Sequence, residues 1–144
     1  MGIELHTKME TVRSMKNNSI KPMHVDKNTC NCDLYNKSIL IVDDDVALLN
    51  ELYELLSFYK MRAVGVISVD QAIEVVRTIS VDVVLTDFNM PVLNGLELAR
   101  AIELLQPTTK IIIMSGIFID TEAWSHSWQF LQKPFQMDAL IPLL

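Results

Sequence analysis

The sequence has no apolar run that could cross a bilayer, because the longest ones, such as Ile111 to Met114, are far shorter than the roughly 20 residues required. The first residues, 1–16, include acidic side chains and no apolar stretch, so they do not resemble a secretory signal. Repeats and low-complexity runs are absent as well. We therefore expect a soluble, cytoplasmic protein that does not associate with membranes.

Cysteine is scarce: Cys30 and Cys32 are the only two, separated by one residue. A C-x-C pair can bind a metal ion, but no second Cys or His pair stands at the spacing of a zinc site, and His24 is the nearest further ligand. Structural or incidental thiols are the favoured interpretation, with a metal site as the alternative.

Positive charge is in short supply over residues 37–144, which hold 7 Lys and Arg against 14 Asp and Glu. An acidic domain repels a nucleic acid backbone, so we expect no direct nucleic acid binding. Residues 1–36 are polar, with weak helical periodicity, and are interpreted as an N-terminal extension or linker that is partly helical at most. Half of the 144 residues are hydrophobic, which suffices for one packed domain at 37–144.

Short apolar runs alternate with segments of helical spacing from Lys37 onward. Strands apolar on both faces, alternating with helices, are typical of a parallel sheet covered on both sides. The predicted fold class is α/β: a doubly wound, five-stranded parallel sheet with the flavodoxin-like order 2-1-3-4-5. The predicted strands are Ser38–Val42, Ala63–Val66, Val81–Thr86, Lys110–Met114 and Gln129–Gln132, and the predicted helices are Val46–Tyr59, Ser68–Thr78, one from about Gly95 to before Pro107, and Met137 to at least Pro142.

Polar residues stand where the predicted strands end, at the edge where doubly wound sheets bind ligands. Asp43 and Asp44 follow the first strand, Asp87 the third, Ser115 the fourth and Lys133 the fifth. Crowded carboxylates repel one another by on the order of 1 to 4 kcal/mol per pair unless a cation neutralises them. Mg²⁺ fits because it prefers oxygen ligands, so Asp43 and Asp44 are candidate metal ligands.

The same residues suit phosphoryl transfer, which needs an in-line nucleophile and positive charge around the transferring oxygens. A carboxylate can be that nucleophile and form an aspartyl phosphate. We expect Asp87, at the end of the central strand, to take this role. Lys133 would neutralise the phosphoryl oxygens, and Ser115 would donate a hydrogen bond to one of them.

The motifs ILIVDDD, DVVLTDFNMP-x-LNG, KIIIMSG and QKPF stand in the order of the response-regulator receiver family, and the chain resembles that family over about residues 37–144. The resemblance implies that Asp87 is the phosphoacceptor and that the backbone carbonyl of Asn89 is a third protein ligand of Mg²⁺. It also implies a cis-proline junction at Lys133–Pro134. Phe130 falls at the family's aromatic switch position, although burial in the core is an equal alternative for a residue without a hydroxyl.

The function implied is that of a signalling phosphoacceptor in a two-component system or phosphorelay, with intrinsic self-phosphorylation and dephosphorylation at most. Its donor would be a sensor histidine kinase or a histidine phosphotransfer protein, and its downstream protein is not specified. Two other classes remain. One is a haloacid-dehalogenase-type phosphatase, whose D-x-D-x-[TV] motif is only partly met. The other is a receiver-fold interaction module that acts without phosphorylation.

Some of these residues have simpler interpretations. Asp45 is expected to cap the following helix, and Asp43 and Asp44 have capping as their alternative role. Ser68 and Gln71 are spaced as a capping box.

Two departures from the family pattern lie near the end of the chain. Ser115 and Lys133 are 18 positions apart, about four fewer than in the family, so we expect a shortened fourth helix region in which the helix is short, distorted or missing. The segment Thr121–Ser127 has room for one or two helical turns. The last helix is short and nearly all apolar, and such a surface should be covered. Residues 1–36 or a second subunit, in a homodimer through this apolar end, are the two coverings considered.

Overall fold

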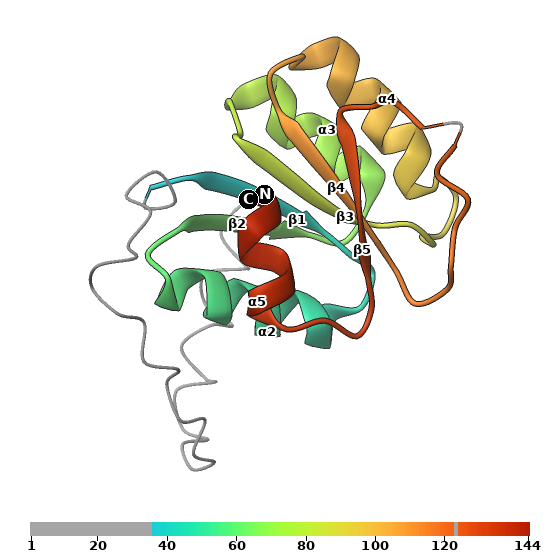
Figure 1. Ribbon diagram of the computed structural model, residues 1–144. Coiled ribbons are helices and arrows are strands. Elements are labelled where there is room, and N and C mark those ends of the chain that lie inside the picture. Colours follow the sequence, from blue (N-terminus) through green and yellow to red (C-terminus); the bar gives the residue numbers. More distant parts are fainter. Residues whose placement is uncertain (1–35, 123) are drawn as a thin grey trace. The chain divides into compact units, whose positions relative to one another are not determined.

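The computed structural model describes residues 36–122 and 124–144, which form a five-stranded parallel sheet of order β2-β1-β3-β4-β5 with helices on both faces (Figure 1). This confirms the predicted fold class and strand order. The strands are β1 (Ser38–Val42), β2 (Arg62–Val66), β3 (Val83–Asp87), β4 (Lys110–Ser115) and β5 (Trp128–Gln132). The helices are α2 (Val46–Phe58), α3 (Val69–Thr78), α4 (Gly95–Leu105) and α5 (Met137–Leu140), the last continued by the 3₁₀ turn η3 (Ile141–Leu143).

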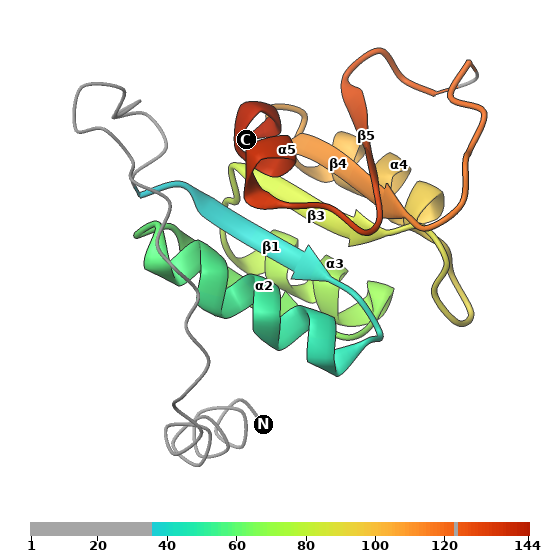
Figure 2. The same cartoon turned by 60° about the horizontal axis from the view of Figure 1, so that its bottom comes forward.

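Side chains of each strand alternate between two apolar cores. Ile39 and Ile41 of β1 pack with α2 and α5 on one face of the sheet, whereas Leu40 and Val42 pack with α3 and α4 on the other. Figure 2 shows α2 running along β1, with α3 and α4 behind the sheet. These four side chains of β1 are buried, which explains why the strand is apolar on both faces. Within the described part of the chain, no helix is long and apolar enough to cross a membrane.

β3 begins two residues later than predicted. The N–H of Val81 donates to Oε1 of Gln106 at 3.0 Å and not to a neighbouring strand. The same glutamine donates through Nε2 to the carbonyls of Val76 and Ile79, and Thr109 donates to it at 3.1 Å. Gln106 therefore ties the end of α3 to the starts of β3 and β4.

Helix caps fit the prediction in part. Oδ1 of Asp45 accepts from the N–H groups of Ala47 and Leu48, as expected for the cap of α2. Ser68 caps α3, but the side chain of Gln71 accepts from Ile67, one residue before the cap, so the predicted reciprocal capping box was wrong. A complete capping box opens α4 instead, formed by Asn94 and Glu97.

The β4–β5 connection contains no helix over its described residues, 116–122 and 124–127. This confirms the shortened fourth helix region, while the helical turns expected in Thr121–Ser127 are isolated hydrogen-bonded turns. Trp124 of this connection packs near two aromatic residues of β5: its ring centroid is 6.3 Å from that of Trp128 and 6.2 Å from that of Phe130. We call these three residues the aromatic cluster. Glu103 of α4 accepts hydrogen bonds from the hydroxyls of Ser125 and Ser127, which ties the segment to that helix.

The last helical segment is short, as predicted, and continues as η3 through Pro142. Its apolar side chains pack on the protein's own core: Leu140 and Leu144 are buried, and Met137 and Leu143 pack against the same cluster. The exposed apolar surface that suggested a covering segment or a homodimer is therefore largely internal. The predictions for residues 1–36, including Cys30 and Cys32, lie outside the described residues except at Asn36, which forms a turn.

Candidate functional site

Parallel strands of the sheet end level with one another, so the residues that follow them meet at one edge. Val42 pairs with Thr86, Asp87 with Met114, and Ser115 with Gln132. The polar residues at these strand ends are largely buried: Asp43 is 1% exposed, Asp87 8% and Ser115 1%, while Asp44 is exposed. Polar groups are rarely buried to this degree without partners, so the contacts among them define the site.

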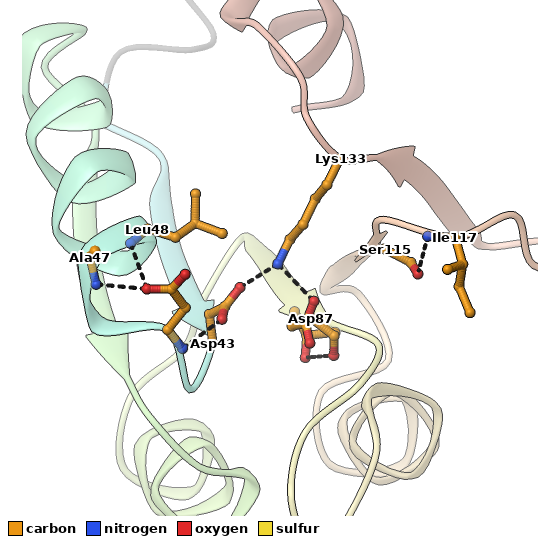
Figure 3. A network of polar contacts seen from close by, with 9 residues as sticks. Asp43, Ala47, Leu48, Asp87, Ser115, Ile117 and Lys133 are labelled. Atoms are coloured by element: carbon orange, nitrogen blue, oxygen red, sulfur yellow. Dashed lines mark hydrogen bonds and ion pairs between the residues drawn. The ribbon is translucent and has the colours of Figure 1, made fainter.

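Lys133 bridges two of the carboxylates (Figure 3). Its Nζ lies 2.7 Å from Oδ2 of Asp43 and 2.7 Å from Oδ1 of Asp87. The backbone of Lys133 is fixed as well, because its N–H donates to the carbonyl of Ser115 at 2.7 Å. The peptide bond between Lys133 and Pro134 is cis, as the resemblance implied.

Three carboxylates form an acidic cluster around this bridge. One oxygen from each of Asp43, Asp44 and Asp87 lies within 4.8 Å of the others. Within the described residues, the ammonium of Lys133 forms ion pairs with two of these carboxylates, so a set of three ionised carboxylates and one ammonium carries a net charge of about −2. Hard oxygen donors and residual negative charge fit Mg²⁺. Asn89 is exposed in the loop two residues after Asp87, and the role of its carbonyl as a ligand stays a prediction.

The site perturbs the protonation of two of its members. Burial raises the pKa of Asp87 above its ordinary value, and the nearby charge of Asp43 adds to this, while the hydrogen bond and charge of Lys133 act in the opposite direction. Burial also works to lower the pKa of Lys133, but its hydrogen bonds to Asp43 and Asp87 outweigh burial and raise that pKa. The lysine is thus held as a cation, and the raised pKa of Asp87 means that ionising this carboxyl costs more than ionising an exposed aspartate.

Ser115 lies at the neighbouring strand end, outside the lysine bridge. Its Oγ accepts a hydrogen bond from the N–H of Ile117 at 3.2 Å (Figure 3). A hydroxyl that accepts one hydrogen bond still has its own proton to donate. Ser115 can therefore donate to an oxygen placed beside Asp87.

Phe130 is half-buried on β5, opposite Ile113 of β4 and next to Trp124. It belongs to the aromatic cluster and not to the acidic one. Its role as a switch stays a prediction. Two residues that the sequence reasoning missed are Thr86 and Gly95, which contact the backbone of Asp87. The sequence offered a signal for each of them: Thr86 is a hydroxyl residue within an apolar strand, and Gly95 is a glycine at the start of a helix.

The family model described as "Response regulator receiver domain" matches residues 39–144. The chain belongs to this family. Receiver domains are signalling modules of two-component systems and are generally not enzymes.

Relatives of known role agree with this assignment. "Regulatory protein VirG" of Agrobacterium tumefaciens is 35% identical over 80 residues, covering 56% of this chain and 30% of that protein. "Transcriptional regulatory protein ZraR" of Klebsiella oxytoca is 34% identical over 106 residues, covering 71% and 24%. "Autoinducer 1 sensor kinase/phosphatase LuxN" of Vibrio harveyi is 34% identical over 93 residues, covering 60% and 10%. The chain thus spans less than a third of the length of each of these proteins.

Solved structures show the same fold. A response regulator receiver protein from Sinorhizobium medicae superposes with a TM-score of 0.69 at 26% identity, covering 76% of this chain and 92% of that one. The chemotaxis response regulator CheY4 of Vibrio cholerae gives a TM-score of 0.67 at 21% identity, covering 76% and 99%. The second likeness shows the fold alone.

Proposed function

We propose that this receiver domain takes a phosphoryl group from a phosphohistidine onto Asp87 in a reaction that depends on Mg²⁺. The observation that carries the proposal is the double bridge of Lys133 to Asp43 and Asp87, at 2.7 Å each, inside the three-carboxylate cluster. A lysine held as a cation beside a candidate nucleophile suits a reaction that gathers negative charge.

The transfer is a displacement at phosphorus. A carboxylate oxygen of Asp87 forms the new O–P bond, the P–N bond to the donor's imidazole breaks, and the electron pair stays on the ring nitrogen, which takes up a proton. Asp43, Asp44, Asp87 and the carbonyl of Asn89 are the proposed ligands of Mg²⁺. When bound, the ion supplies positive charge to the phosphoryl oxygens and to the crowded carboxylates.

Lys133 and Ser115 complete the site. The Lys133 ammonium, already within hydrogen-bonding distance of Asp87, is placed to bind one phosphoryl oxygen. The Ser115 hydroxyl donates to another. Hydrolysis of the acyl phosphate returns the domain to its starting state, and we treat this as an intrinsic property of a signalling protein and not as metabolic catalysis.

The partners follow from the chemistry. The donor is a sensor histidine kinase or a histidine phosphotransfer protein, and a downstream protein reads the phosphorylated state. We place the protein in the cytoplasm, with residues 37–144 as the receiver and 1–36 as an extension or linker. Its acidic charge disfavours direct nucleic acid binding.

The test is the intact mass of the full chain after incubation with acetyl phosphate, with and without Mg²⁺. The wild type should gain one phosphoryl group only with Mg²⁺, and Asp87→Asn should gain none. Asp45→Asn is the matched control, because it removes a neighbouring carboxylate while asparagine keeps the cap of α2. It should be modified like the wild type.

If the wild type showed no added mass, binding of beryllofluoride would be tested next. This phosphoryl mimic is not hydrolysed, so its binding would show that the missing adduct was due to rapid hydrolysis. Failure of both assays would overturn the proposal in favour of a receiver-fold interaction module that acts without phosphorylation. The β4–β5 connection, which has no helix in its described residues and whose Trp124 packs against two aromatic residues of β5, is the feature that favours this alternative.

A further inference from the structure

The backbone of the phosphoacceptor is held from the side opposite its carboxylate. We infer that Thr86 and Gly95 are positioning residues that fix the Asp87–Phe88 peptide and thereby place the Asp87 carboxylate for its reaction. The inference rests on the proposed function of Asp87, and neither residue contacts the reacting atoms in this scheme.

Thr86 is a polar residue in an otherwise apolar stretch of β3, and it is 0% exposed. Burying a hydroxyl is costly unless it forms a hydrogen bond. Its Oγ1 donates to the carbonyl oxygen of Asp87 at 3.1 Å. Since side chains alternate along a strand, Thr86 lies on the face covered by α3 and α4, whereas the Asp87 side chain lies on the opposite face with Lys133.

Gly95 is the first residue of α4 and packs directly on the same peptide. A Cβ at this position would lie 2.3 Å from the carbonyl oxygen of Asp87 and 3.1 Å from Cα of Phe88. Both neighbours are backbone atoms, so no side-chain rotation can make room. The N–H of Gly95 also donates to the carbonyl of Phe88 at 3.0 Å. Lack of space, and not an unusual backbone conformation, requires glycine here, since the described glycines have no positive φ.

A third contact completes what we call the clamp. The N–H of Phe88 donates to the carbonyl of Met114 on β4 at 2.8 Å. In this clamp, Thr86 holds the carbonyl of Asp87 and Gly95 holds the carbonyl of Phe88. Met114 holds the N–H of Phe88. The Asp87 carboxyl carbon is two bonds from Cα, so a shift of this peptide moves Oδ1 away from Lys133. Misplacement of a reacting group by about 1 Å can cost about 100-fold in rate.

Thr86→Val tests the hydroxyl because valine keeps the shape and removes the hydrogen bond. The control is Thr109→Val: Thr109 is also buried, and its Oγ1 lies 2.8 Å from the carbonyl oxygen of Val81 and 3.1 Å from Oε1 of Gln106, far from the site. We expect both variants to lose stability. Only Thr86→Val should react with acetyl phosphate more slowly per folded molecule, by about 10-fold, and only Thr86→Val should speed hydrogen exchange of the Phe88 amide relative to global unfolding.

Gly95→Ala is the stronger perturbation, with Gly65→Ala as its control. The Gly65 Cβ would meet the side chain of Leu49 at 2.7 Å, so this variant is crowded away from the site. Gly95→Ala should slow phosphorylation and weaken Mg²⁺ binding, whereas Gly65→Ala should affect stability alone. Should Gly95→Ala fail to fold, the threonine pair decides.

The amide exchange separates this inference from the proposed function. A wild type that takes no phosphoryl group would overturn the function, while selective exchange at Phe88 in Thr86→Val would still support the clamp. Equal effects of Thr86→Val and Thr109→Val on both rate and Phe88 exchange would overturn the clamp.

Discussion

Replacing Asp87 with asparagine removes one carboxylate from the acidic cluster at nearly constant side-chain size. Oxygens of Asp43 and Asp44 lie within 4.8 Å of an Asp87 oxygen, so each pair repels by about 3.5 kcal/mol at an effective dielectric of about 20. Lys133, at 2.7 Å, attracts the Asp87 carboxylate by about 6 kcal/mol on the same scale. The remainder is a net repulsion of about 1 kcal/mol. Burial of Asp87 adds to it, and the solvent exposure of Asp44 reduces it.

Without Mg²⁺, Asp87→Asn should therefore unfold with a free energy higher by about 1 kcal/mol, which corresponds to roughly 4 °C in melting temperature for a domain of this size. The advantage should fade as pH falls. Because the folded pKa of Asp87 is raised, the native state binds its proton first, and the penalty on the wild type disappears as pH drops through that pKa toward the ordinary value of 3.8.

The assay is thermal and urea unfolding at neutral pH in chelator and then in Mg²⁺. At a tenfold excess of Mg²⁺ over its dissociation constant, the wild type should gain about 1.4 kcal/mol, and Asp87→Asn should gain less because a neutral amide oxygen replaces a carboxylate oxygen. Asp45→Asn, outside the cluster, should respond to Mg²⁺ like the wild type. A mutant that is less stable than the wild type in chelator and equally responsive to Mg²⁺ would refute the acidic-cluster reasoning.

Two further predictions concern the opposite end of the sheet. The backbone N–H and the hydroxyl of Ser38 hold the pKa of Asp82 below its ordinary value. This aspartate therefore contributes stability above about pH 4 that is lost as pH falls through its lowered folded pKa. In acid titrations, the difference in unfolding free energy between the wild type and Asp82→Asn should shrink over this pH range, and a constant difference would contradict the prediction. Gln106→Ala should lower the free energy of unfolding in urea by about 1 to 3 kcal/mol, because it leaves the N–H of Val81 and two carbonyls without their partner. The control is Gln136→Ala, at an exposed position. Equal losses of stability in the two variants would argue against the role of Gln106.

Much of this site could be predicted because strand ends are visible in a sequence. A fully apolar run followed by acids, as at Val42 and Asp43, marks both the strand and the point where it stops, and parallel pairing then brings such points together. The contacts of Lys133 with Asp43 and Asp87 follow from this convergence of strand ends, although their distances could not be predicted.

The clamp could not be predicted in the same way. It depends on how closely the start of α4 approaches β3, a distance set by the loop between Phe88 and Asn94 and by the packing beneath it. The last helix illustrates a second limit. Apolar residues at 137–144 indicate that a surface is covered, but not by what, and the structure covers Leu140 and Leu144 with the domain's own core.

The aromatic cluster gives the protein an optical property. The chain has two tryptophans: Trp124 lies in the β4–β5 connection, which hydrogen bonds to Glu103 of α4, and Trp128 is the first residue of β5. The three tyrosines lie elsewhere in the sequence. Indole fluorescence of the unlabelled chain therefore comes from the end of the β4–β5 connection and from the start of β5, so this part of the chain can be followed by fluorescence without an engineered dye.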